Sequence, residues 1–194
     1  MSDRNQLRII GGRWRSRRLM LPPKAGLRPS ADAVRETLFN WLLNYIDGAR
    51  CLDLFAGSGA LGLEAVSRGA RQAVLVERSQ AVVRALRENV YRLRADKAVQ
   101  IIHADARRFL SGRAEPFDLV FLDAPFRSAL IERVCPRLDS AGWLADGAVI
   151  YLETDVHRSL GGLPSNWRAM RAARTGSVSY RLLQYEAVGL AGDG

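Results

Sequence analysis

The sequence predicts an α/β fold in which helices cover both faces of a mostly parallel sheet. Three observations support this fold class. Cys51–Gly62 runs from an apolar strand through an acid into a glycine-rich loop, and a helical pattern follows at once. Two later apolar runs, 73–77 and 117–123, also end in an acid. The chain then finishes with two extended segments on either side of Gly176, typical of an antiparallel pair. We expect one compact domain, because 194 residues suffice for a sizeable core.

The first 28 residues are strongly basic. They carry eight Lys or Arg against Asp3 alone, which is +7 of the total net charge of +9. Apolar residues on both sides of Gly11-Gly12 predict two short strands around a glycine turn, with the arginines on one face. Such a hairpin could simply protect a sheet edge with charge. We favour contact with RNA or DNA, because folding has no need of so uneven a charge.

A helix should follow the linker at Pro22-Pro23. Ser30 is a candidate N-cap, Asp32 lies in the favourable first turn, and apolar residues recur at helical spacing until Asp47-Gly48. We expect this helix to pack on the domain. Its start could cover a ligand pocket as a lid, or it could be purely structural.

The glycine loop is the candidate cofactor site. Gly57, Gly59 and Gly62 spell G-x-G-x-x-G, which suits a dinucleotide but would also fit a bare structural turn. Glu77, after the next strand, could accept hydrogen bonds from the ribose hydroxyls of NAD or of S-adenosylmethionine. Asp53 would repel a pyrophosphate but suits the ammonium group of S-adenosylmethionine. The sequence therefore favours the methyl donor.

The remaining elements continue the alternation of strand and helix. After the helix Ser79–Leu93 comes the strand 99–102, and Asp105 then opens a short helix at Arg107–Leu110, as an N-cap or as a partner for an exocyclic amine. The strand Phe117–Asp123 ends in Asp123-Ala124-Pro125-Phe126, at the edge of the sheet where ligands bind. The later elements are a helix at Ala129–Leu138 and strands at Ala148–Glu153, Trp167–Arg174 and Val178–Val188.

Composition narrows the class of protein further. Almost all of the 29 basic residues are arginine, which suits bidentate phosphate contacts and a polyanionic partner. Cys51 and Cys135 form no metal-binding pattern, so we expect buried reduced thiols and no metal site. No apolar run reaches the ~20 residues of a membrane span. A cytoplasmic protein is the default expectation, and a monomer is the default oligomeric state.

With these motifs identified, the sequence resembles the class I amino-methyltransferases, whose second motif is [DNS]-P-P-[FYW]. More narrowly it resembles the bacterial 16S ribosomal RNA guanine-N2 methyltransferase family, named for guanine 966. The likeness covers nearly the whole chain. It is carried by Asp53–Gly59 and Asp123–Phe126, together with segments at 8–12, 14–15, 28–29, 34–42, 142–144 and 180–182. One departure is Ala124, where the family has proline; alanine keeps the carbonyl but loosens φ.

The resemblance implies a Rossmann-like sheet of seven strands with an antiparallel C-terminal pair. It implies a basic hairpin at 1–28 that binds RNA and a methyltransferase domain at 29–190. The implied catalytic residues are Asp123, Ala124, Pro125 and Phe126. The implied cofactor-binding residues are Asp53, Phe55, Ala56, Gly57, Ser58, Gly59, Glu77, Arg78, Asp105 and Ala106. The implied RNA-binding residues are Arg8, Arg13, Arg15, Arg17, Arg18, Arg28 and Arg35.

The implied reaction is methylation of a guanine N2 amine in 16S rRNA, free or within the small ribosomal subunit or its assembly intermediate. Asp123 and the Ala124 carbonyl would hold the amine, and Phe126 would stack on the extruded base. Three alternatives stay open: a non-catalytic RNA-binding assembly factor, a methyltransferase for another RNA or DNA amine, and an NAD oxidoreductase. The last finds support only in the glycine loop.

Overall fold

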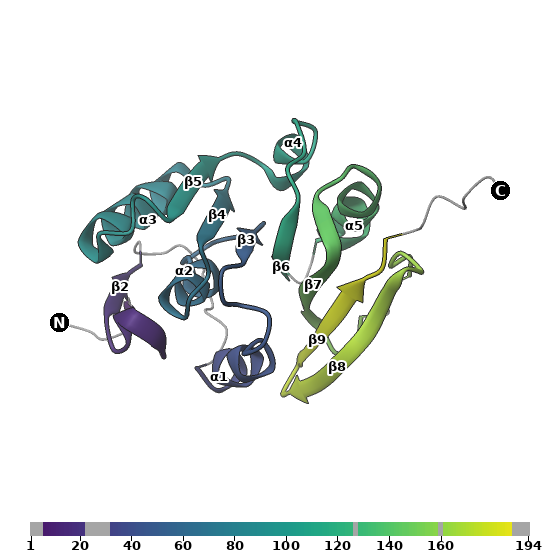
Figure 1. The fold of residues 1–194 in the computed structure, drawn as a ribbon, viewed down its shortest axis with the longest axis horizontal. Helices are drawn as coiled ribbons and strands as arrows, with labels where there is room; N and C mark the ends of the chain where they lie inside the picture. The colour runs from purple at the N-terminus through teal and green to yellow at the C-terminus, as the bar shows by residue number, and fades with distance from the viewer. Residues whose placement is uncertain (1–5, 22–31, 126–127, 159–160, 188–194) are drawn as a thin grey trace.

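The computed structural model describes residues 6–21, 32–125, 128–158 and 161–187 (Figure 1). Arg28, Ser30 and Phe126, which the sequence singles out, lie outside these residues.

A seven-stranded sheet with the order β5-β4-β3-β6-β7-β9-β8 forms the centre of the molecule (Figure 1). The first five strands in this order run parallel, whereas β9 is antiparallel to both of its neighbours. This arrangement confirms the predicted sheet with its antiparallel C-terminal pair. The strands are β3 (Arg50–Asp53), β4 (Gln72–Glu77), β5 (Val99–His103), β6 (Phe117–Asp123), β7 (Leu144–Asp155), β8 (Trp167–Thr175) and β9 (Val178–Tyr185).

Two apolar cores, one on each face of the sheet, hold the helices in place. One core packs α1 (Asp32–Trp41), α2 (Ala60–Ser67) and α3 (Gln80–Leu93) against one face. The other packs α4 (Ala106–Phe109) and α5 (Leu130–Ser140) against the opposite face. Because alternate residues of a strand point to opposite faces, each buried strand contributes to both cores.

The basic N-terminal segment forms a small hairpin beside α2 and α3. Its strands β1 (Gln6–Arg8) and β2 (Arg18–Met20) pair antiparallel, and the 3-10 turn η2 (Gly12–Trp14) lies between them. Four apolar side chains of the segment are buried in the same core as α1–α3: Leu7, Ile9, Trp14 and Leu19. The arginines point outward, so the predicted separation of apolar and basic faces is correct.

Several element boundaries differ from the prediction by one or more residues, those of α1, α4 and β7 among them. Helix α1 ends at Trp41 rather than at Asp47, because Leu42 and Ile46 are buried in the turns that follow and so prolong the apolar spacing. Helix α4 begins one residue earlier than predicted, at Ala106. Strand β7 begins at Leu144 rather than at Ala148, because a register irregularity against β6 admits the polar residues after Leu144.

The described residues include no helix long and apolar enough to cross a membrane. In the same part of the chain, no group of three or more His, Cys, Asp or Glu could hold a metal ion. Cys51 and Cys135 are buried free thiols, as predicted. Burial raises the pKa of Cys135 to about 12, so this thiol is held in its unreactive form.

Candidate cofactor and catalytic site

Four acids line the carboxyl ends of four adjacent parallel strands: Glu77 on β4, Asp53 on β3, Asp123 on β6 and Glu153 on β7. Asp53 pairs with Phe121, and Asp123 pairs with Glu153. Strand alternation therefore puts all four side chains on the face that carries α1–α3. Strand order reverses between β3 and β6, and this reversal is where open parallel sheets bind ligands.

The glycine loop joins β3 to α2, and each glycine of the motif has its own role. Gly57 and Gly59 have φ of 49° and 76°, a left-handed backbone that suits glycine. Gly62 is needed for packing, because a Cβ there would lie 2.2 Å from the Leu75 side chain on β4. The motif thus specifies a tight turn and close contact between helix and sheet, neither of which is particular to a dinucleotide.

The acids at the ends of β3 and β4 hold this loop in shape. Asp53 Oδ2 accepts the Gly62 N–H at 3.0 Å. Glu77 accepts the Gly57 N–H at 3.1 Å through one oxygen and the Ser79 N–H at 2.6 Å through the other. Both residues were predicted as cofactor ligands, and the structure shows that each also organises the loop.

The remaining loop residues are positioned by the backbone. The Ala56 N–H donates to the Val76 carbonyl at 3.0 Å, and the Gly59 N–H donates to the Ala56 carbonyl at 2.7 Å. Ser58 is buried, and its hydroxyl accepts the Ala60 N–H at 3.3 Å. Phe55 is half-buried against the second core. Their contacts to a cofactor stay predictions.

Asp53 is unusual in its ionisation. The carboxyl is only 2% exposed. Burial raises its pKa to about 7, and this effect outweighs the opposing hydrogen bond from the Gly62 N–H. A second, smaller cause that also raises the pKa is the nearby Glu77 carboxylate. A cationic ligand nearby would stabilise the charged form of Asp53.

Asp105 caps helix α4 at the end of β5. Its side chain accepts the Arg107 N–H at 3.0 Å, which confirms the predicted N-cap role. The hydrogen bond from the Arg107 guanidinium lowers the pKa of Asp105, so this carboxylate stays charged. The neighbouring Ala106 is buried, and Arg78 at the end of β4 is exposed. Contact of these three residues with the cofactor stays a prediction.

The predicted catalytic residues follow β6. Ala124 is 4% exposed, and the Pro125 carbonyl accepts the backbone N–H of Ser128 at 2.9 Å, which closes a turn. A small surface pocket lies between this turn and Glu153. The structure therefore brings Asp123, Ala124 and Pro125 to the carboxyl edge beside the glycine loop, whereas Phe126 lies outside the described residues.

Sequence reasoning missed a buried polar pair next to Asp123. The Tyr151 hydroxyl donates to Glu153 Oε2 at 2.7 Å, and both side chains are buried. Burial, followed by the nearby Glu153 carboxylate, raises the pKa of Tyr151, so this hydroxyl remains a donor. The sequence carried a signal for Glu153, because it too ends an apolar run, as Asp53, Glu77 and Asp123 do.

Six of the seven arginines that were predicted to bind RNA are described by the structure, and they fall into two groups; Arg28 lies outside the described residues. Arg8, Arg13, Arg15, Arg17 and Arg18 are exposed on the hairpin. Arg13 lies over the Trp14 ring at 4.3 Å, and Arg8 lies 3.9 Å from Asp32. RNA contact by these five residues stays a prediction.

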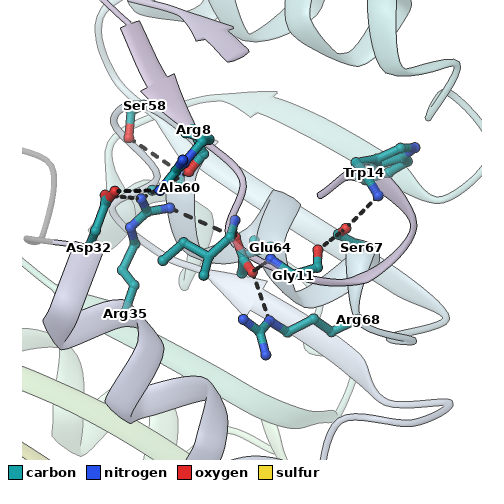
Figure 2. Close-up of polar contacts among 12 residues, drawn as sticks. Arg8, Gly11, Trp14, Asp32, Arg35, Ser58, Ala60, Glu64, Ser67 and Arg68 are labelled. Atoms are coloured by element: carbon teal, nitrogen blue, oxygen red, sulfur yellow. Dashed lines mark hydrogen bonds and ion pairs between the residues drawn. The ribbon is translucent and has the colours of Figure 1, made fainter. Parts of the chain in front are cut away.

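Arg35 belongs to the second group, and the structure corrects its role. Its side chain is fully buried rather than exposed to a polyanion. The guanidinium donates to Asp32 Oδ1 at 2.6 Å and to the Arg8 carbonyl at 3.0 Å (Figure 2). It also lies 3.8 Å from Glu64 Oε2. Arg35 therefore joins α1 to the hairpin and cannot reach RNA phosphates.

Glu64, which sequence reasoning also missed, anchors the hairpin to α2. It is fully buried and accepts the backbone N–H groups of Ile10 at 2.8 Å and Gly11 at 2.7 Å (Figure 2). Arg68 donates to the same carboxylate at 2.7 Å. One turn further along, the Ser67 hydroxyl donates to the Gly11 carbonyl at 2.6 Å and accepts the Trp14 N–H at 2.9 Å. The hairpin is thus fixed to the helix that follows the glycine loop.

Comparison with known proteins gives one family and several similar chains. The family model described as "Conserved hypothetical protein 95" matches residues 7–184. Ribosomal RNA small subunit methyltransferase D of Escherichia coli (strain K12) is 49% identical over 188 residues, covering 97% of this chain and 94% of its own. The Haemophilus influenzae protein of the same name is 42% identical over 184 residues, covering 93% and 95%. The solved structure of the Escherichia coli protein yhhF, described as a candidate methyltransferase, has a TM-score of 0.86 at 48% identity, covering 94% of this chain and 99% of that one.

Proposed function

Because the chain belongs to the family of the ribosomal RNA small subunit methyltransferases D, we propose that it methylates the exocyclic N2 amine of a guanine in 16S rRNA, using S-adenosylmethionine. The observation that carries this proposal is the position of Asp123 and Ala124. Asp123 ends β6 and Ala124 follows it, at the strand-order reversal beside the glycine loop that follows β3. Residues of the second motif of amino-methyltransferases thus meet a candidate cofactor loop at one edge.

The residues around the glycine loop fit S-adenosylmethionine. Gly57 and Gly59 turn the backbone so that no side chain stands between the loop and a ligand. Glu77 is half-buried at the end of β4, where a carboxylate can accept hydrogen bonds from ribose hydroxyls. Asp105 presents a charged carboxylate at the end of β5, suited to an adenine amine. When bound, the cofactor supplies an electrophilic methyl group on a sulfonium centre.

The chain's own residues position and activate the amine. The lone pair of guanine N2 is delocalised into the ring, so the amine is a poor nucleophile until it is held and made pyramidal. The Asp123 carboxylate and the Ala124 carbonyl are two acceptors on consecutive residues, suited to the two N–H groups of one amine. Asp123 is also placed to receive the proton that the amine gives up. Catalysis then rests mainly on positioning and on this pair of acceptors.

The hairpin arginines and the motif aromatic complete the proposal. A base must leave its stack before its amine can reach a protein site, and an aromatic ring commonly supports the extruded base. Phe126 takes that role by its place in the motif. Arginines on the outer face of the hairpin hold RNA phosphates and position the substrate.

Single-turnover methylation of an unmodified small ribosomal subunit tests the proposal. Asp123→Ala should slow methyl transfer by about 100-fold or more, because one preorganised acceptor is lost. RNA affinity should not change, since phosphates are held elsewhere. Ala124→Pro, which restores the family residue, should be neutral or slightly faster, since the carbonyl is kept.

Calorimetry with S-adenosylmethionine, S-adenosylhomocysteine and NAD completes the test. Binding of the first two but not of NAD is expected. Full methylation by Asp123→Ala would refute the acceptor role, and an absence of methyl-donor binding would leave an RNA-binding assembly factor as the better description.

A further inference from the structure

A basic pocket lies where the hairpin meets α3, on the side of the molecule away from the antiparallel strands. It has a volume of about 220 Å³ and is lined by Arg17, Arg18, Leu19, Asn89, Arg92 and Leu93. The two leucines and Asn89 are buried and form its floor. The three arginines are exposed and form its rim. A floor of fixed side chains below a rim of guanidinium groups is suited to one phosphate-bearing nucleotide.

The floor of this pocket is held in place because the Asn89 side chain hydrogen-bonds the backbone of β2, as a neighbouring strand would. Its amide nitrogen donates to the Met20 carbonyl at 3.0 Å, and its amide oxygen accepts the Met20 N–H at 2.9 Å. These two bonds fix the hairpin against α3 at the point where the arginines of both elements meet. The pocket is therefore set by the fold and does not depend on the positions of long side chains alone.

The outer face of α3 continues the basic surface. At about 100° per residue, Arg84, Arg87 and Tyr91 lie within one narrow stripe, opposite the apolar face of the helix. Tyr91 is 71% exposed, more than any other large hydrophobic residue in the described part of the chain. The acid nearby on this helix is Glu88, which pairs with Arg92 at 2.7 Å, so the stripe keeps a net positive charge.

From these observations we propose that the α3 surface, defined as Arg84, Arg87, Tyr91 and Arg92 together with Arg17 and Arg18, binds single-stranded rRNA between the hairpin and the catalytic edge. This inference rests on the proposed function, since the partner is its RNA substrate. The arginines contact phosphates, and Tyr91 stacks on an unpaired base. An exposed aromatic between arginines is the usual means by which proteins hold single strands without reading their sequence.

The direction of α3 supports a continuous path. The helix begins directly after Glu77-Arg78 at the carboxyl edge of the sheet and ends beside the hairpin pocket. Its 14 residues span about 21 Å, a length that several nucleotides would follow. RNA held by the hairpin would therefore pass along α3 toward the strand ends that carry Asp53 and Asp123.

Fluorescence anisotropy with a labelled single-stranded RNA, and with a duplex of the same sequence, tests the α3 surface. The triple variant Arg84→Ala, Arg87→Ala, Arg92→Ala should bind the single strand at least tenfold more weakly than wild type at low salt. In a plot of log affinity against log salt concentration, its slope should be shallower by about 2, since each of the three lost phosphate contacts contributes about 0.7. The matched control removes three exposed arginines of β8, Arg168, Arg171 and Arg174, at the opposite end of the sheet (Figure 1).

A second variant isolates the aromatic contact. Tyr91→Ala should lose about tenfold in affinity for the single strand but little for the duplex, and Tyr91→Phe should behave as wild type. Equal losses in the α3 and β8 triple variants would overturn the surface, as would an unchanged affinity of Tyr91→Ala for single strands. If either outcome is found while the wild-type protein binds RNA and methylates normally, only the α3 surface is refuted and the proposed function stands. A wild-type protein that bound no RNA would overturn both.

Discussion

At the scale of single residues, Gly12 shows how closely the hairpin fits its support. Its φ is +72°, and a Cβ at this position would lie 1.9 Å from the Ser67 carbonyl oxygen at the end of α2. A Cβ on the neighbouring Gly11 would lie 2.6 Å from the guanidinium of the Arg68 side chain. At Gly12 the backbone of the hairpin thus packs directly on the backbone of α2, and this contact fixes the orientation of the hairpin that carries the arginines.

Replacement of Gly12 tests whether that fit orients the RNA-binding arginines. Gly12→Ala should displace the hairpin and weaken RNA binding, while affinity for S-adenosylmethionine is kept. Gly48→Ala is the matched control, because Gly48 has a φ of +68° but no atom within 4 Å of its virtual Cβ. The control should cost only the strain of a left-handed alanine, about 1–2 kcal/mol of unfolding free energy. Equal RNA affinity in both variants would contradict the orienting role.

Asp53 gives a prediction about pH. In the folded protein its pKa is raised to about 7 from 3.8, chiefly by burial. Between about pH 4 and pH 7 the native state therefore binds more protons than the unfolded state, so the unfolding free energy falls as pH rises through this window. The total change attributable to this group is on the order of 4 kcal/mol. Above about pH 7 its contribution is constant.

Urea unfolding of wild type and Asp53→Asn at several pH values measures this effect. The difference in unfolding free energy between the two proteins should change between about pH 4 and pH 7 and stay constant above that range. Asp96→Asn, which alters an exposed carboxylate, is the control. Parallel pH profiles for wild type and Asp53→Asn would show that Asp53 is ionised in both states.

The sequence predicted a residue's place in the site correctly where that place depends on its neighbours in the chain. Asp53, Glu77 and Asp123 could be found because each ends an apolar run, and strand ends meet at one edge. Arg35 could not be assigned correctly, since it stands in a helical pattern like any surface arginine. Its burial is decided by Glu64 and by the Arg8 carbonyl, which are brought together only by the fold. Glu64 was missed for the same reason.

At the scale of elements, α2 serves two sites. Its N-terminus follows the glycine loop and gives the Gly62 N–H to Asp53, while Glu64 and Ser67 further along hold the hairpin. The candidate cofactor loop is therefore attached to the first half of one eight-residue helix, and the basic hairpin to its second half. The distance between them is set by a rigid element rather than by a linker.

Two Glu–Arg pairs with the same spacing provide a matched test of this attachment. Glu64–Arg68 and Glu88–Arg92 are both i,i+4 pairs at 2.7 Å, but Glu64 is fully buried and Glu88 is about half exposed. Glu64→Ala should cost about 3–5 kcal/mol of unfolding free energy, because the N–H groups of Ile10 and Gly11 would lose their acceptor and the buried Arg35 would lose one of its two carboxylates. Glu88→Ala should cost less than about 1 kcal/mol. Urea unfolding measures both values. Similar costs for the two variants would show that the buried cluster around Glu64 contributes little to the unfolding free energy.

At the scale of the whole molecule, the exposed arginines and the acids of the candidate site lie in different places along the sheet. The hairpin and α3 carry exposed arginines at the β5 end of the sheet, and β8 carries three more at the other end: Arg168, Arg171 and Arg174 (Figure 1). The acids lie between these ends, at the carboxyl edge. A polyanion bound to the hairpin and α3 would thus meet the candidate site from the β5 side.

Deletion of residues 1–20 tests whether the hairpin is separable from the rest. Removal of four buried apolar side chains should lower the unfolding free energy by more than about 3 kcal/mol and the melting temperature by at least about 6 °C. S-adenosylmethionine should still bind below the new melting temperature. A melting temperature equal to that of wild type would show that the hairpin contributes nothing to the fold, and calorimetry reports the binding.

The bonds that hold the hairpin also decide when it can form during synthesis. Its partners Glu64 and Asn89 lie 53 to 69 residues further along the chain. Two three-residue strands are not stable alone, so the hairpin segment cannot take its final shape until α2 and α3 have been made. At about 5–20 residues per second, that delay lasts several seconds. Until then the arginines of residues 6–20 have no fixed arrangement, and they form a shaped surface only once Asn89 on α3 can hold Met20.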